Sequence, residues 1–123
     1  MRTFLLAAGA LLLPCAALAA DISGDWKIDS SVGTTPISIN CTLVQTGQAL
    51  SGACAPAVGN AGPTALTGAV DGAKAAWGYD VVFRGKPAHV GYTADITSDS
   101  AMTGVLELSG KPSPFTAARR PGP

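Results

Sequence analysis

Apolar and polar residues alternate in short segments along most of this chain, and turn residues separate the segments at close spacing. Beyond the first 20 residues, no stretch repeats its apolar positions every 3.6 residues as an amphipathic helix does. The alternation indicates an all-β fold. It predicts eight strands, near residues 22–29, 36–45, 49–55, 64–70, 73–84, 87–97, 101–108 and 113–119.

The connections between these strands are mostly short. Glycine first in a two-residue loop suits a type II′ turn, and Asp-Gly suits a type I′ turn. On these grounds we predict tight turns at Gly47-Gln48, Asp71-Gly72, Gly85-Lys86 and Ser98-Asp99-Ser100. Two longer connections are expected, at residues 30–35 and 56–63.

Pairing the strands outward from these turns gives one consistent inner face. It sets Val70 opposite Ala73, Phe83 opposite Ala88, Tyr79 opposite Tyr92 and Ile96 opposite Met102. Nearly all large apolar residues then share one face. The opposite face collects Lys74, Asp80, Arg84, His89, Asp95 and Glu107. Turns chosen separately agree on one interior, which supports the assignment.

Glycines recur at inward positions of four predicted strands, namely Gly24, Gly52, Gly68 and Gly104. An inward glycine weakens a strand but permits the sharp coiling that a small barrel needs. We therefore predict an eight-stranded antiparallel up-and-down β-barrel. A two-sheet β-sandwich is the alternative.

The first 19 residues have the features of a secretory signal peptide. Arg2 precedes an apolar run, and an Ala-Leu-Ala sequence predicts cleavage after Ala19. A lipid anchor on Cys15 is the rival interpretation. The remainder, residues 20–123, has the size of a single domain. Eight basic and eight acidic residues balance one another, which argues against a nucleic-acid partner, and no second apolar run is long enough to span a membrane.

Cys41 and Cys54 lie on the two predicted strands that flank Gly47-Gln48. Counting pairs outward from that turn sets the cysteines opposite each other at a non-hydrogen-bonded position, close enough for a disulfide. In an exported protein such a pair is expected to be oxidised. We predict a structural clasp rather than a redox-active pair, remote from any functional site.

Gly24-Asp25-Trp26 on the first strand and Arg119-Arg120 at the end of the last strand resemble the pattern of the calycins, the lipocalins and their relatives. The resemblance implies that Trp26 closes one end of the barrel and that Arg119 or Arg120 covers it. The length is closer to avidin-like barrels and to periplasmic metalloprotease inhibitors of the Inh type. The run from Tyr92 to Arg120 also resembles small secreted bacterial β-domains without an assigned role.

The chain offers little for catalysis. His89 is the only histidine, it is predicted to face outward, and no nucleophile with a neighbouring base is visible. We expect no enzyme activity, no metal and no cofactor.

The predicted interior suggests binding instead. Trp77, Tyr79, Phe83 and Tyr92 line a ligand pocket or simply form the core. Arg84, Lys86 and Lys111 are expected at the barrel mouth, where they would suit an amphiphile with an anionic head. We predict a non-enzymatic, secreted or periplasmic barrel for a small apolar or amphiphilic ligand. The alternatives are a protein-binding module such as a protease inhibitor, and an envelope-associated structural accessory.

Overall fold

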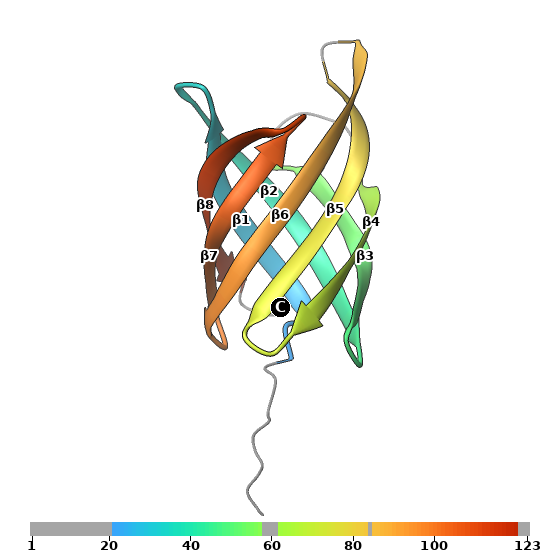
Figure 1. Ribbon diagram of the computed structural model, residues 1–123, viewed down its shortest axis with the longest axis vertical. Helices are drawn as coiled ribbons and strands as arrows, with labels where there is room; N and C mark the ends of the chain where they lie inside the picture. The colour runs from blue at the N-terminus through green and yellow to red at the C-terminus, as the bar shows by residue number, and fades with distance from the viewer. Residues whose placement is uncertain (1–20, 58–61, 84, 121–123) are drawn as a thin grey trace, which may run out of the picture.

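A computed structural model describes residues 21–57, 62–83 and 85–120. Eight antiparallel strands form a closed barrel in which each strand pairs with the next along the chain (Figure 1). They are β1 (Gly24–Val32), β2 (Thr35–Thr46), β3 (Ala49–Pro56), β4 (Thr64–Asp71), β5 (Lys74–Phe83), β6 (Lys86–Ser98), β7 (Ala101–Leu108) and β8 (Lys111–Arg119). β1 and β8 close the circle, with Trp26 opposite Arg119. The predicted up-and-down barrel is confirmed, and the two-sheet alternative is wrong.

The predicted signal peptide and Cys15 lie outside the described residues, as does Arg84. Phe83 ends β5, but its side chain also falls outside the description. Among the described residues, no helix has the length and apolar character needed to cross a bilayer.

Alternation along the strands separates one interior from one exterior. In β4, for example, Leu66 and Val70 are buried while Thr67 and Ala69 are exposed. The predicted outward residues within the described ranges are all exposed, namely Lys74, Asp80, His89, Asp95 and Glu107. The inner faces of the strands join into one hydrophobic core.

Two hairpins are paired two residues away from the predicted register. Val70 lies opposite Ala75, and Asp71 opposite Lys74, so the β4–β5 turn is Gly72-Ala73 rather than Asp71-Gly72. Gly72 has a φ of 61°. The first residue of this loop needs positive φ, which glycine supplies without steric cost, and Asp71 therefore remains in the strand.

The β5–β6 hairpin is also shifted by two residues, but in the opposite sense. Phe83 pairs with Lys86 rather than with Ala88, so Lys86 belongs to β6 and not to the predicted turn. Trp77, not Tyr79, lies opposite Tyr92. A shift of two residues leaves every side chain on its predicted face, because the side-chain period of a strand is two. The predicted interior therefore survives the error in register.

Two other connections are tighter than predicted. β1 continues to Val32 and reverses at Gly33-Thr34, because Gly33 adopts a φ of 62° that permits a two-residue loop. At the β6–β7 hairpin Ile96 pairs with Met102 as predicted. Beyond that pair a register irregularity absorbs one residue, and Ser98 pairs with Ala101.

The inward glycines are sites of close strand approach. A Cβ atom on Gly52 would lie 1.9 Å from the carbonyl oxygen of Thr42, and one on Gly104 would lie 1.9 Å from that of Thr93. These distances are far shorter than any van der Waals contact, so a side chain at either position would push neighbouring strands apart. The sharp coiling expected of these glycines therefore has a direct steric basis.

Candidate functional site

The barrel has a closed end, where the turns β2–β3, β4–β5 and β6–β7 lie, and an open end, where the turns β1–β2 and β7–β8 lie (Figure 1). At the closed end Trp26 is fully buried, and its Nε1 donates a hydrogen bond of 3.0 Å to the carbonyl oxygen of Ile22. Ile22 is itself fully buried, and its N–H donates to the side chain of Gln45. This end of the interior is filled.

Arg119 covers Trp26. Its guanidinium carbon lies 4.8 Å from the centroid of the indole ring, a favourable cation–π distance. The same guanidinium group donates hydrogen bonds to the carbonyl oxygens of Asp21, Ser23 and Asp99. Of the two arginines considered from the sequence, Arg119 occupies the expected place, and Arg120 contributes a backbone N–H to the carbonyl oxygen of Asp25.

An aromatic cluster fills the middle of the barrel. The Trp77 and Tyr92 rings are stacked, with centroids 4.9 Å apart and planes 15° apart. Phe115 meets both rings edge-on, at centroid distances of 6.4 Å from Trp77 and 5.6 Å from Tyr92. Trp77 and Tyr92 are almost completely buried. These two predicted ligand-lining residues therefore belong mainly to the packed core.

A cavity of about 600 Å³ occupies the interior towards the open end. Its described lining is mainly apolar: Val32, Pro36, Ile37, Ile39, Cys54, Ala55, Pro56, Val81, Val82, Val90, Leu106 and Leu108, together with Ser38, Gly62, Thr64 and Tyr79. Of the aromatic residues singled out from the sequence, Tyr79 lies on this wall. The volume falls within the range of about 300–1,000 Å³ that is typical of small-molecule sites.

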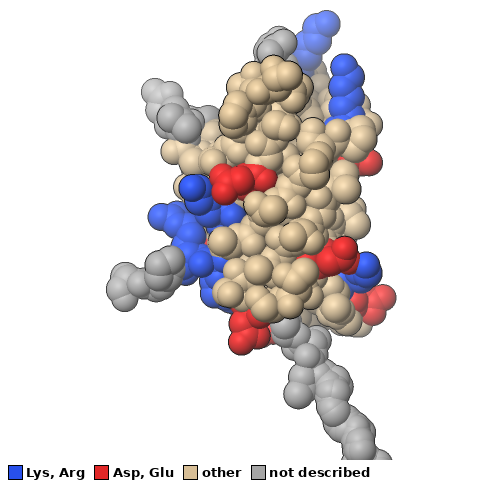
Figure 2. Space-filling view, turned by 90° about the vertical axis from the view of Figure 1, so that its left-hand side faces the viewer, with Lys and Arg blue, Asp and Glu red and all other residues tan. Residues whose placement is uncertain are grey.

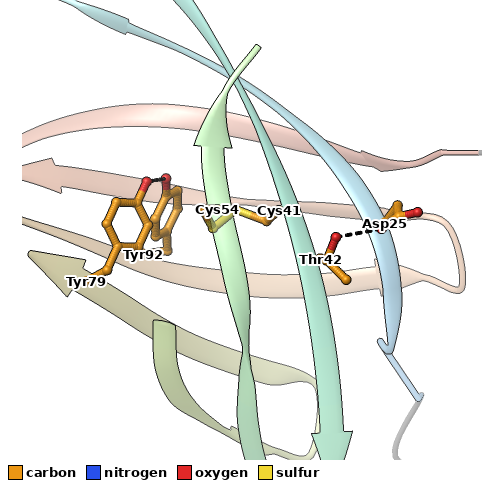
Figure 3. The surroundings of a disulfide bond; sticks show 6 residues. All are labelled: Asp25, Cys41, Thr42, Cys54, Tyr79 and Tyr92. Atoms are coloured by element: carbon orange, nitrogen blue, oxygen red, sulfur yellow. Dashed lines mark hydrogen bonds between the residues drawn. A yellow bond between two sulfur atoms is a disulfide. The ribbon is translucent and has the colours of Figure 1, made fainter. Parts of the chain in front are cut away.

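Tyr79 and Tyr92 meet through their hydroxyl groups, whose oxygens are 2.6 Å apart (Figure 3). Burial raises the pKa of Tyr79, and the hydrogen bond with Tyr92 only partly offsets this. Burial, with a further contribution from the adjacent Tyr79, raises the pKa of Tyr92 well above its ordinary value. Both hydroxyl groups are therefore protonated at neutral pH.

The predicted disulfide is confirmed. Cys41 and Cys54 lie opposite each other in β2 and β3, with Cα atoms 4.0 Å apart. Both cysteines are buried, and Cys54 lies on the cavity wall. Tyr79 lies on the same cavity wall. The clasp therefore adjoins the cavity, whereas the sequence led us to expect it far from any site.

The open end carries positive charge at its rim rather than on the cavity wall. Lys86 and Lys111 begin β6 and β8, and both are exposed. Lys111 pairs with Leu108, a lining residue, yet neither lysine belongs to the described lining. Figure 2 shows basic side chains rising from this end and others gathered lower on the same face. Arg84, the third predicted mouth residue, lies outside the described residues.

His89 lies on the outer surface, as predicted from the register. Its Nδ1 is 2.8 Å from a carboxylate oxygen of Asp80, and both side chains are largely exposed. A Cβ on Gly78 would lie 3.1 Å from Nε2 of His89, so the imidazole covers a strand surface that has no side chain of its own. Within residues 21–57, 62–83 and 85–120, no three His, Cys, Asp or Glu side chains form a group suited to a metal ion.

Phe115 and most of the cavity-lining residues received no role in the sequence analysis. Phe115 completes the aromatic cluster, and Ile37 and Leu108 line the cavity. The signal was present in the alternation. Ile37 shares the inner face of β2 with Ile39 and Cys41, and Phe115 is the single large residue in a strand of small and polar ones.

The chain was compared with known proteins. No protein-family model matches it. No curated protein matches it either.

Proposed function

We propose that this protein is a binding protein for a small, mainly apolar molecule, which it holds in the cavity at the open end of the barrel. The observation that carries the proposal is the cavity itself, with about 600 Å³ of volume and a wall made mostly of Val, Ile, Leu and Pro side chains. Binding in such a space removes apolar ligand surface from water, which is worth about 25 cal/mol per Å². Antiparallel barrels of eight strands have room for one small ligand when their interior is not filled by side chains.

We propose binding rather than catalysis because of the chemistry of the wall. Tyr79 is the only residue with a titratable side chain among the described lining residues, since Cys54 is held in the disulfide. Its pKa is raised, so the hydroxyl is a poor general base. His89, the one histidine in the chain, is on the outer surface beside Asp80.

We also propose that the protein acts outside the cytoplasm and that its barrel is calycin-like. A disulfide in a small domain is typical of an oxidising compartment, and it accompanies the predicted signal peptide. The stacking of Arg119 on Trp26 at the closed end supports a likeness to calycins.

Blocking the cavity tests the binding proposal. Ile37 is a partly buried lining residue on β2, and Val44, on the outer face of the same strand, is 46% exposed. Ile37→Trp should place an indole ring in the cavity and weaken binding of N-phenyl-1-naphthylamine, an uncharged fluorescent probe, at least tenfold. Val44→Trp adds the same ring to the outside and should leave the affinity unchanged. Equal binding by all three proteins would refute a site in the cavity.

The protein-partner alternative predicts another result. A partner captured from periplasmic extract would bind Ile37→Trp as well as it binds the unmodified protein. A structural accessory would show neither the probe nor a stoichiometric partner.

A further inference from the structure

The wall of the proposed binding cavity contains one paired polar group. The hydroxyl of Tyr79, a lining residue, meets the hydroxyl of Tyr92 at 2.6 Å. In Figure 3 both rings point the same way, so that the two hydroxyl oxygens come together. The pair therefore brings polar atoms to the inner part of a mainly apolar space.

The hydrogen-bonding capacity of this pair is not exhausted by the bond between its members. Each tyrosine hydroxyl has one proton to donate and can also accept. The bond between the hydroxyls uses one proton, and the other has no acceptor among the described residues. A buried donor without an acceptor costs about 1–3 kcal/mol, so a ligand that supplies an acceptor removes that cost.

Tyr79, the member of the pair that lines the cavity, is the donor that can reach a ligand, and its hydroxyl is held through the hydrogen bond to Tyr92. The Tyr92 ring stacks on the Trp77 ring, with centroids 4.9 Å apart. It also meets Phe115 in an edge-on arrangement, with the two ring planes 81° apart. Tyr92 is 2% exposed, which leaves its ring little room to move. A fixed donor loses little conformational entropy on binding and so favours ligands whose acceptor lies at a matching position.

The charge of the surroundings selects the kind of acceptor. No Lys, Arg or His belongs to the described lining, and Lys86 and Lys111 are exposed at the rim. A carboxylate or phosphate at the tyrosine pair would lose its hydration without gaining a counter-ion, which is strongly unfavourable. A neutral carbonyl oxygen loses far less hydration and gains the same hydrogen bond.

We propose that the ligand contains an uncharged hydrogen-bond acceptor, of the ketone, ester or amide class, and binds with that group inward at the Tyr79–Tyr92 pair and its hydrocarbon part towards the open end. This inference rests on the proposed binding function. It also reverses the orientation expected from the sequence, in which an anionic head lay at the basic mouth.

The test compares three probes of equal chain length, 2-nonanone, nonane and nonanoate, by displacement of N-phenyl-1-naphthylamine at pH 7. The unmodified protein should bind 2-nonanone about fivefold more tightly than nonane, as one net hydrogen bond implies. Nonanoate should bind more weakly than the ketone. The carbonyl stretching frequency of bound 2-nonanone should fall below its value in hexane, because hydrogen bonding weakens the C=O bond.

A double variant, Tyr79→Phe with Tyr92→Phe, removes both hydroxyls while keeping both rings. Its preference for 2-nonanone over nonane should disappear, its affinity for nonane should stay within twofold, and the carbonyl frequency should return to the hexane value. Thr67→Val is the matched control, since it removes a hydroxyl from the exposed outer face of β4, away from the described cavity lining. That variant should keep the fivefold preference.

The possible failures can be told apart. Tight binding of nonane with no preference for the ketone would overturn the inward acceptor while leaving the proposed function standing. A preference for nonanoate that persists in the double variant would do the same and would place the head group at the basic rim. Failure of the unmodified protein to bind any of the probes would refute the proposed function and this inference together.

Discussion

The filled and hollow parts of this barrel are made by the same eight strands with the same inward alternation, yet they differ in the size of the inward side chains. The filled part contains Trp26, Trp77, Tyr92 and Phe115. The hollow part is lined largely by Val, Ile, Leu and Pro. The difference teaches that alternation determines which residues point inward, whereas side-chain volume determines whether they meet across the barrel. Stability and binding are thereby assigned to different parts of one core.

The largest expected effect comes from emptying the filled part. Trp26→Ala removes a fully buried indole and should lower the free energy of unfolding by about 3–5 kcal/mol. Urea denaturation followed by circular dichroism measures this. Val82→Ala, at a 75% exposed position beside the cavity, serves as the control and should change stability by less than about 0.5 kcal/mol. Similar losses at both sites would contradict the contrast.

The disulfide belongs to both parts of the barrel, because both cysteines are buried in the core and Cys54 also lines the cavity. Replacing both Cys41 and Cys54 with Ala should cost about 3 kcal/mol, as the chain-entropy account gives for a loop of this length. Thermal unfolding at matched concentrations checks the loss. If probe binding at a temperature where the variant is folded falls more than twofold, the clasp also shapes the cavity.

Arg119 tests the closed end with a smaller change. Arg119→Lys keeps the charge but loses the planar group that stacks on Trp26 and reaches three carbonyl oxygens. We expect a loss of about 2 kcal/mol in urea denaturation, comparable to one or two charge-assisted hydrogen bonds. Arg120→Lys should be close to neutral. A reversed order between the two would show that Arg120 closes the barrel.

The smallest effects on stability are expected from enlarging one side chain in each part, and the two changes should have opposite signs. Ala94→Val adds two methyl groups at a 1% exposed position in the packed core and should destabilise by about 1–3 kcal/mol. Val81→Leu adds one methylene group at a cavity-lining position and should stabilise by about 0.5 kcal/mol. Differential scanning calorimetry resolves both changes. If Val81→Leu lowered stability and Ala94→Val left it unchanged, position 81 would be in the packed part and position 94 would face the space, opposite to the structure.

The fold could be predicted because it depends on features local to the sequence. Alternation, glycine-containing turns and the spacing of Cys41 and Cys54 each restrict the pairing of neighbouring strands. The inner face survived register errors in two hairpins, because a shift of two residues changes the partner of a residue but not its side of the sheet. For the same reason the alternation could not reveal which of these neighbours pair.

The candidate site was less predictable, because it depends on which residues lie opposite one another across the strands and not only on which side of the sheet each side chain occupies. The shift that places Tyr92 opposite Trp77 creates the stacked pair that fills the middle of the barrel. It also leaves Tyr79 one step further along the interior, on the cavity wall. Whether two inward aromatic rings pack together or line a space depends on distances across the barrel, which a strand-by-strand pattern does not contain.

The pairing of β1 with β8 has a consequence for the order in which the chain can mature. Hairpins from β1 to β7 can form without β8, but β1 lacks its second neighbour until residues 116–119 are available. Until then two strand edges are open, and such edges are sites of mispairing between chains. A protein shortened before β8 is therefore expected to associate through those edges. Closure therefore requires the end of the described chain, and it includes Arg119, the residue that also covers Trp26.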